Sequence, residues 1–483
     1  MRIRSLLFLS LALAGCNGSS STAPVSLRPT ASNLTARVND NNVLSAFVVF
    51  DARNVVSARV FAAGGGESTV TPTTVMTDGP QQVLVMGLLP ETDYVFRLEV
   101  NGATETVVAP DIAYRTPALP DFLKNNLQVR TIGSSTGGYY LTNLITADPT
   151  RNYLFAFDDR GRIRWYRLIP GMGASSELLP NGNFLTFMGS STGFQDDYGY
   201  FLELSPAGEE VNRYQAPRPY YTDGHELLFT PASGGGEYTH FFSYDRRVID
   251  TTSIGGQPNT TIAGHQILRY KPDGELEFRW DAWDHFEIAD WIEEPAGDRQ
   301  RPEGDFDHPN SLEIDLDGNY IVSWRNMAEV TKIDSKTGDV IYRFGGRNNQ
   351  FTILNDPFYD AQGGFAFSGQ HSVRVLANGN LLLYDNGLRH NPQQSRAVEY
   401  ALDVTARTAT MVWQFPHIPP LYTPFTGSVQ RLANGNTVVG FAFRGAVVEV
   451  DPAGALLWEA AIVADNLSVV TYRINHIKSL YER

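Results

Sequence analysis

One hairpin signal recurs four times between residues 179 and 436, and this repetition constrains the fold more than any other feature of the chain. Asn-Gly and Asp-Gly pairs supply the positive φ that tight hairpins require, and each copy joins two apolar runs. The copies are Asn181-Gly182-Asn183, Asp317-Gly318-Asn319, Asn378-Gly379-Asn380 and Asn434-Gly435-Asn436. After each copy come a strand, a second Gly-containing turn and another strand that often carries Trp. Four short strands per repeat are typical of a β-propeller blade.

The repeats predict an all-β fold with six blades. We expect the blades at residues 139–168, 174–218, 225–280, 308–346, 371–415 and 427–461. A β-like tail at residues 469–480 remains, and we expect it to close the ring against the first blade. The sequence therefore predicts a six-bladed β-propeller in residues 119–483.

Residues 25–118 are predicted to form a separate unit. Short β-type runs alternate there with turn-rich breaks, and no cluster of catalytic residues stands among them. The segment 87–94 ends in Tyr94 and resembles the tyrosine corner of fibronectin type III domains, in which the Tyr hydroxyl pins a loop that crosses between two sheets. We expect a small Ig/fibronectin-III-like β-sandwich that acts as a scaffold or as a homodimer contact.

Residues 1–16 are predicted to be an export signal. Arg2 and Arg4 precede an apolar run at residues 6–13, which is too short to span a bilayer. The run ends in a Leu-Ala-Gly-Cys motif at Cys16, which resembles a bacterial lipoprotein signal. That resemblance implies lipidation of Cys16, a tether at residues 17–24, and an exported protein in the periplasm or on the cell surface, anchored in the outer membrane. Cys16 is the one cysteine of the chain, so no disulfide can form within it.

The charge balance excludes one class of partner. The chain carries 38 Lys and Arg against 53 Asp and Glu, a formal net charge of -15 at pH 7, and no basic run relieves it. Such a chain repels nucleic acid, so we expect no nucleic-acid partner. A site for an anionic small substrate would have to build its own local positive field.

Alignment of the repeats on their hairpins predicts one shared functional site. The residues that open the innermost strand of each blade face the central channel, and residues at the end of the second strand return to the same end of the propeller. Six polar residues are therefore expected to converge at one mouth of the channel: His225, His308, Asn310, Arg325, His371 and Asn386.

Three imidazoles and a guanidinium, with no converging carboxylate, suit an oxyanion. Arg and protonated His can bind sulfate oxygens and neutralise charge on a leaving oxygen. One neutral His could attack sulfur while another protonates the departing phenolate, because imidazole titrates near neutral pH. The other histidines lie outside this register, and we interpret them as structural or surface residues: His240, His265, His285, His390, His417 and His476.

Several motifs around these residues resemble the arylsulfotransferase (aryl-sulfate sulfotransferase) family. They are His308-Pro309-Asn310, Ser323-Trp324-Arg325, Gln370-His371 and Tyr384-Asp385-Asn386-Gly387. The resemblance implies an N-terminal Ig-like domain followed by a six-bladed propeller. It also implies ping-pong transfer of a sulfuryl group from an aryl sulfate donor to a phenolic acceptor through sulfohistidine, with no phosphoadenosine donor, other cofactor or metal.

The resemblance further implies a role for each residue of the site. His371 would be the nucleophile that becomes sulfated, and His225 would be the general acid and base. Four residues complete the site, with His308 and Arg325 holding the sulfuryl oxygens during catalysis and Asn310 and Asn386 binding substrate.

Two other functions remain open at this point. A propeller can bind a ligand or a protein without catalysis, because a fold does not fix a function. His225, His308 and His371 could also be three zinc ligands of a metal-dependent lyase or hydrolase, although the guanidinium of Arg325 would repel a dication.

An acidic insertion at residues 281–307 interrupts the blade pattern and contains Trp283 and Trp291. It could be a lid or an aromatic wall for the acceptor, or a plain surface excursion.

Overall fold

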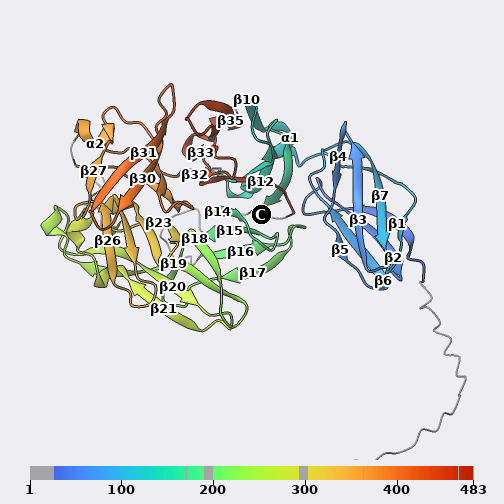
Figure 1. The fold of residues 1–483 in the computed structure, drawn as a ribbon, viewed down its shortest axis with the longest axis horizontal. Helices are drawn as coiled ribbons and strands as arrows, with labels where there is room; N and C mark the ends of the chain where they lie inside the picture. Colours follow the sequence, from blue (N-terminus) through green and yellow to red (C-terminus); the bar gives the residue numbers. More distant parts are fainter. Residues whose placement is uncertain are drawn as a thin grey trace, which may run out of the picture.

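The computed structural model describes residues 27–146, 148–169, 171–189, 199–292, 303–362, 364–465 and 467–481, which fold almost entirely into β-strands (Figure 1). The export signal, Cys16 and the tether at residues 17–24 lie outside these residues. The described helices include α1 (Asp121–Asn125), α2 (Pro357–Gln362) and the 3-10 turn η6 (Arg325–Met327). Within the described part of the chain, no helix is both long enough and apolar enough to cross a membrane.

Two sheets form the N-terminal unit, and a single hydrophobic core lies between them. One sheet contains β1 (Thr30–Val38), β2 (Ala46–Arg53) and β6 (Gly79–Val85); the other contains β3 (Ser57–Gly64), β4 (Glu67–Val70), β5 (Thr74–Val75), β7 (Asp93–Asn101), β8 (Thr106–Val108) and β9 (Ile112–Arg115). Buried and exposed residues alternate along β7, as expected for a strand with one face on a core. The Tyr94 hydroxyl accepts the backbone N–H of Leu89 at 2.9 Å, which is the contact expected of a tyrosine corner.

The remaining described strands form six sheets in a propeller-like arrangement. The strands of each sheet are given from the innermost outward. The first sheet contains β37 (Ile474–Ile477), β11 (Tyr139–Leu144), β12 (Tyr153–Asp158) and β13 (Ile163–Leu168), and the second contains β14 (Met172–Leu178), β15 (Phe184–Gly189), β16 (Tyr200–Leu204) and β17 (Glu210–Tyr214). The third contains β18 (Tyr221–Pro231), β19 (Glu237–Ile249), β20 (Thr260–Tyr270) and β21 (Leu276–Asp281), with β22 (Glu303–Asp305) parallel to β20.

The fourth sheet contains, in the same order, β23 (Pro309–Ile314), β24 (Tyr320–Trp324), β25 (Glu329–Ile333) and β26 (Val340–Gly345). The fifth contains β28 (His371–Val375), β29 (Leu381–Asp385), β30 (Arg396–Asp403), β31 (Thr408–Pro416) and β27 (Thr352–Leu354). The sixth contains β32 (Ser428–Arg431), β33 (Thr437–Phe441), β34 (Ala446–Val450), β35 (Leu456–Ala464) and β10 (Leu127–Gly133), with β36 (Leu467–Ser468) beside β35. The innermost strands contact one another in the closed order β14, β18, β23, β28, β32, β37 and back to β14.

The predicted hairpins join the first and second strands of four sheets. Their glycines have positive φ: 83° at Gly182, 84° at Gly318, 83° at Gly379 and 90° at Gly435. Tryptophans near the outer strands link neighbouring sheets through their indole N–H groups. Trp165 donates to the carbonyl of Pro206 in the next sheet, Trp280 to that of Gly338, and Trp458 to that of Asp159. These residues therefore pack the sheets together, as expected of core tryptophans.

Both ends of the chain segment that forms the sheets help to close the ring. The tail strand β37 pairs with β11, as the sequence predicts, and it is the innermost strand of that sheet. A second closure was not expected: β10 pairs along its whole length with β35.

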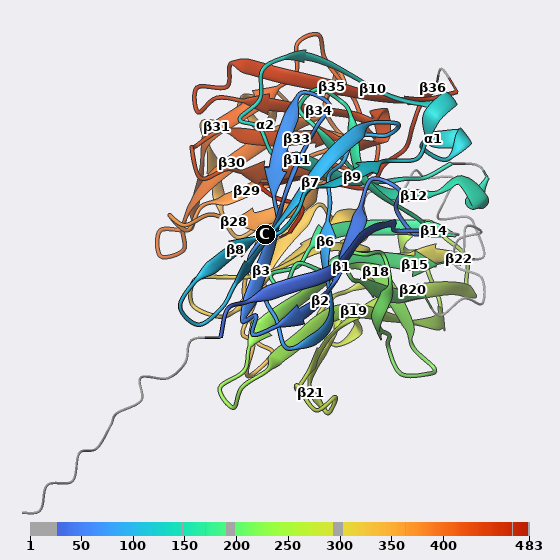
Figure 2. The same cartoon turned by 90° about the vertical axis from the view of Figure 1, so that its right-hand side faces the viewer.

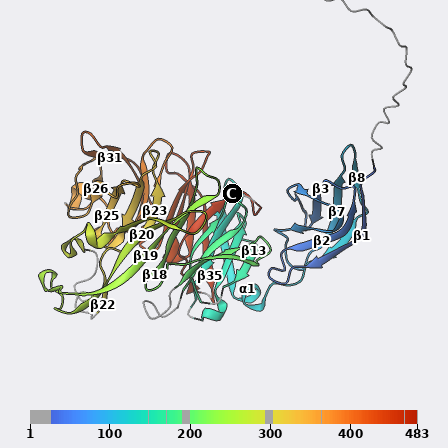
Figure 3. The ribbon, with the colours of Figure 1, turned by 90° about the horizontal axis from the view of Figure 1, so that it is seen from below.

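The N-terminal unit packs beside the ring of sheets (Figures 1, 2 and 3). The Tyr481 hydroxyl near the end of the chain accepts the backbone N–H of Met86 at 2.8 Å, and Arg164 donates to the carbonyl of Gly87 at 3.0 Å. Leu44 joins a hydrophobic cluster of the ring. These contacts fit a scaffolding role for the unit.

Candidate active site

The innermost strands are irregular where the predicted site residues lie. Their pairing with the second strand shifts register between Thr222 and Leu227 in β18, between Pro309 and Ser311 in β23, and between His371 and Arg374 in β28. A β-bulge bends a strand and turns side chains away from the regular two-residue alternation. These bulges therefore control which side chains meet at the channel.

The four predicted catalytic residues lie together. The rings of His225 and His308 meet edge to face with their centroids 4.8 Å apart. The backbone N–H of Arg325, the first residue of η6 after β24, donates to the carbonyl of His308 at 3.0 Å. The charge of Arg325 acts on both His308 and His371, and His225 and His308 also act on His371. The third, fourth and fifth sheets thus contribute one cluster.

His371 is held as a neutral imidazole with a defined tautomer. It is 2% exposed, and its Nδ1 lies 2.9 Å from the carbonyl of Gly369 and 2.7 Å from Oδ1 of Asn386. Both partners are acceptors, so Nδ1 carries the proton and Nε2 carries the lone pair. The backbone N–H of Thr426 donates weakly to Nε2 at 3.3 Å. Burial, and then the charge of Arg325, hold the pKa of His371 well below its usual range.

Of the two predicted substrate-binding asparagines, Asn386 bonds to the ring of His371 and Asn310 bonds to the residue before it. The amide of Asn386 is fully buried, and its Nδ2 donates to the carbonyls of Thr423 and Thr426 at 2.8 and 2.9 Å. Asn310 is also fully buried and donates to the carbonyl of Gln370 at 2.6 Å. These contacts give both side chains a positioning role, and direct binding of substrate by either stays a prediction.

The expectation that no carboxylate joins the site is wrong. Nδ1 of His225 lies 2.8 Å from Asp223, and Nδ1 of His308 lies 2.6 Å from Asp305. A carboxylate accepts the Nδ1 proton, so Nε2 is the ring atom of each histidine that can exchange a proton with substrate. Burial raises the pKa of both carboxyls, but the neighbouring imidazoles outweigh it and the pKa of each ends below its usual value. Burial also lowers the pKa of His308, against the charge of Asp305.

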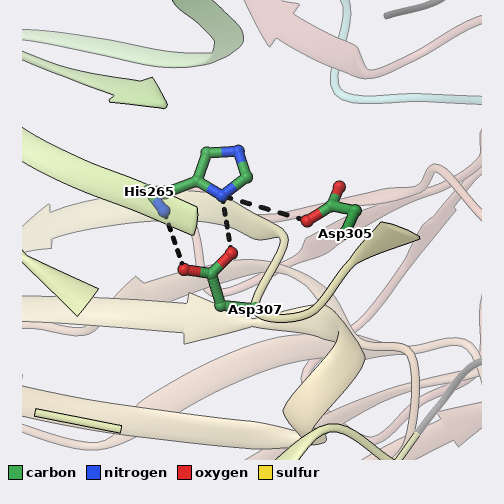
Figure 4. Close-up of side chains that lie close together, drawn as sticks. All are labelled: His265, Asp305 and Asp307. Carbon is green, nitrogen blue, oxygen red and sulfur yellow. Dashed lines mark hydrogen bonds and ion pairs between the residues drawn. The ribbon is translucent and has the colours of Figure 1, made fainter. Parts of the chain in front are cut away.

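His265 joins this cluster, although its position in the repeat predicts a structural or surface residue. It lies in β20, is 2% exposed, and brings Nδ1 to 2.6 Å from Asp307, whose other oxygen accepts the His265 backbone N–H at 2.9 Å (Figure 4). Among the described residues, the group of side chains with metal-ligand spacing is His265, Asp305 and Asp307. The alternative zinc site of His225, His308 and His371 is not such a group.

Comparison with models of protein families shows to which family the chain belongs. Residues 125–475 match the model of the arylsulfotransferase family, and this segment includes every sheet of the ring and all six predicted site residues. The chain belongs to the arylsulfotransferase family. Membership suggests sulfotransferase activity, with an aryl sulfate as donor and a phenol as acceptor.

Other comparisons add little to the family match. No curated protein matches it. A solved protein of unknown function from Bacteroides caccae is 15% identical, with a TM-score of 0.40, over 70% of this chain and 98% of its own. Virginiamycin B lyase from Staphylococcus aureus is 10% identical, with a TM-score of 0.34, over 73% of this chain and 100% of its own. Similarities this weak say nothing about the reaction.

Two residues that the repeat register did not predict lie beside the candidate site. The ring of Tyr472 stands edge to face with His225, at 5.5 Å between centroids, and with His371, at 6.4 Å. Arg473 is fully buried and makes two hydrogen bonds of 2.7 Å with Glu226. Both residues directly precede β37, the innermost strand of the first sheet. Had the tail been aligned as that strand, both would have fallen in the register of the site.

Several side chains in the described part of the acidic insertion pack into the core. Trp291 is 1% exposed and belongs to a buried cluster with Phe286 and Phe306. The indole N–H of Trp283 donates to Asp245 at 2.9 Å. Residues 293–302 lie outside the described part of the chain, and a lid there stays a prediction.

Proposed function

We propose that this protein moves a sulfuryl group from an aryl sulfate to a phenol by a ping-pong reaction through sulfohistidine at His371. The observation that carries the proposal is the state of His371: a buried, neutral imidazole with a fixed Nδ1 proton, next to the permanent cation Arg325. A neutral imidazole beside a guanidinium is both a nucleophile and part of an anion site.

In the first half-reaction, Nε2 of His371 attacks sulfur and forms the N–S bond while the S–O bond to the donor breaks. Attack requires the weak contact between Thr426 N–H and Nε2 to open. The departing phenolate takes a proton from Nε2 of His225 or His308, which are both oriented by carboxylates. Arg325 neutralises the charge that stays on the sulfuryl oxygens.

In the second half-reaction, the acceptor phenol gives its proton back to the same imidazole. Its oxygen attacks sulfur, the N–S bond breaks, and His371 regains its lone pair. Protons balance over the cycle without any further reactant, because the imidazole that donates a proton in the first step is ready to accept one in the second.

We propose two finer points of architecture on the same basis. The closed ring of innermost strands and the tryptophan links support a six-bladed propeller, and the Tyr94 contact supports an Ig/fibronectin-III-like N-terminal sandwich. The Leu-Ala-Gly-Cys motif supports an exported lipoprotein held in the outer membrane through Cys16.

The test is the mass of the intact protein after a brief incubation with 4-nitrophenyl sulfate. We expect an acid-labile gain of one sulfuryl group together with 4-nitrophenol, and loss of the adduct on addition of a phenol. His371→Ala should abolish the adduct. His285→Ala is the matched control, because His285 stacks on Trp280 away from the cluster and should leave the adduct intact.

Absence of the adduct and of released phenol across several aryl sulfates would refute the transferase. A non-catalytic binding propeller would then be the better interpretation, and His371→Ala would leave binding of its partner unchanged.

A further inference from the structure

We infer that His265 is a positioning residue for sulfuryl transfer, and that its positive charge keeps Asp223 and Asp305 ionised so that they orient His225 and His308. This inference rests on the proposed function. It concerns a side chain that touches neither His371 nor Arg325 in any hydrogen bond of the structure.

The geometry places His265 at the centre of three carboxylates. Its Nδ1 lies 2.6 Å from Oδ1 of Asp307 and 3.9 Å from Oδ1 of Asp305 (Figure 4). Its Nε2 lies 3.6 Å from Oδ2 of Asp223. Asp307 is fully buried and also accepts the backbone N–H of His308 at 2.8 Å. Each of the three carboxylates therefore connects His265 either to a site histidine or to its backbone.

Charge balance explains why a cation is needed there. Asp223, Asp305 and Asp307 are 8%, 5% and 0% exposed, so three negative charges lie close together out of water. A buried carboxylate without a compensating charge takes up a proton. A protonated carboxyl holds an imidazole Nδ1–H far less strongly than a carboxylate does. Burial opposes a charge on His265, but Asp307, Asp223 and Asp305 outweigh it and raise its pKa well above the usual value.

A bound divalent cation fits the same group less well than a proton does. Two ligands of one ion, each about 2.0–2.4 Å from it, are normally about 3 Å or more apart. The 2.6 Å between His265 and Asp307 is instead a charge-assisted hydrogen bond, and both oxygens of Asp307 already accept N–H groups. One observation favours an ion: Oδ1 of Asp305 is buried and has no hydrogen-bond partner. The experiment therefore includes metal analysis.

The experiment compares two donors with leaving groups of different acidity. Phenyl sulfate releases a basic phenolate that needs a proton, whereas 4-nitrophenyl sulfate releases a weakly basic one that needs little help. His265→Asn keeps a hydrogen-bond donor near Asp307 but removes the charge. If His265 maintains the acid, kcat/KM for phenyl sulfate should fall at least about tenfold more than kcat/KM for 4-nitrophenyl sulfate, since general acid catalysis contributes about 10²–10⁴-fold.

His240→Asn is the matched control. His240 lies in the neighbouring strand β19, is 3% exposed, and bonds to Thr230 and Tyr320; burial lowers its pKa to about 3, so it is neutral. Its replacement perturbs packing without removing a charge, so we expect kcat/KM to change by the same factor for both donors. If His265→Asn does not fold, the double variant His265→Asn with Asp307→Asn removes one positive and one negative charge and so restores the charge balance. A folded double variant whose ratio of kcat/KM for phenyl sulfate to kcat/KM for 4-nitrophenyl sulfate equals that of the wild type supports the inference.

Three outcomes would overturn the inference. The first is an equal loss for both donors in folded His265→Asn. The second is about one metal ion per wild-type chain that is missing from the variant. The third is a wild-type protein inert toward both donors, which would refute the proposed function as well and is thereby distinguished from the other two.

Discussion

Replacement of Asn386 by Ala tests how much the hydrogen bond from His371 Nδ1 to Asn386 contributes to the reactivity of His371. Asn386 accepts the Nδ1 proton of His371 at 2.7 Å and donates to the carbonyls of Thr423 and Thr426, so it fixes both the imidazole and the segment that faces Nε2. The side chain is fully buried behind His371. The change should therefore slow the sulfation of His371 and leave the affinity for the donor nearly unchanged.

The magnitude follows from the number of partners that remain. A neutral hydrogen bond contributes about 0.5–1.5 kcal/mol. The carbonyl of Gly369 still lies 2.9 Å from Nδ1, so the reactive tautomer survives the substitution. Because about 1.4 kcal/mol corresponds to a tenfold change in rate, we expect sulfation to slow by about 2- to 12-fold, and not by the much larger factor that loss of the tautomer would cause.

Single-turnover release of 4-nitrophenol, with enzyme in excess over 4-nitrophenyl sulfate, measures this step directly. Asn436→Ala is the control, because its buried amide donates to Glu449 at 2.7 Å in the sixth sheet and should leave the rate unchanged. A loss above about 10³-fold, or a weaker donor affinity with an unchanged rate at saturation, would refute the reasoning. The latter result would show that Asn386 contacts the donor directly.

Three further predictions follow from the same contacts. The low pKa of His371 keeps it neutral through the usual histidine range, so its sulfation by 4-nitrophenyl sulfate, whose leaving group needs little protonation, should stay level in rate as the pH falls from about 7.5 through about 6.5, measured by stopped-flow phenol release. Arg473→Met removes two hydrogen bonds to the buried carboxylate of Glu226, which keeps only Arg374 at 3.3 Å as a cationic partner among the described residues, and should lower the free energy of unfolding by about 1.5–3 kcal/mol in urea titrations. Cys16→Ser should abolish lipidation and release the exported protein from membranes, measured by fractionation and intact mass.

The sequence predicts the parts of the fold that depend on local turns. Asn-Gly and Asp-Gly impose a positive φ wherever they occur, so the four hairpins and the strands beside them could be placed from residue types alone. β10 could not be placed. Most of its side chains are exposed, and it is a strand only because β35, far away in the chain, offers it an edge. Pairing between distant segments leaves no local pattern to find.

The site could be predicted from the sequence only where it follows from the repeat, because the remaining contacts join segments that are distant in the chain. Repeat register brought His225, His308, Arg325 and His371 together because equivalent strands face one channel. The carboxylate partners of His225 and His308 escaped that reasoning: Asp223 lies in the bulged part of β18, where the two-residue alternation fails, and Asp305 lies in β22, outside the repeated strands. His265 stands on the third strand of its sheet and reaches the site through the carboxylates of Asp223, Asp305 and Asp307, not through its place in the repeat.

The Nδ1 partners separate three chemically equal imidazoles into two roles. A carboxylate stabilises the imidazolium that forms when a ring takes up a proton, so His225 and His308, bonded to Asp223 and Asp305, are suited to exchange protons with phenols. A nucleophile must avoid that protonation. His371 meets an amide oxygen and a backbone carbonyl, which fix its tautomer without stabilising a positive charge to the same degree, and Arg325 opposes the charge further. The choice of asparagine, and not aspartate, at position 386 therefore distinguishes the proposed nucleophile His371 from the two histidines that are bonded to carboxylates.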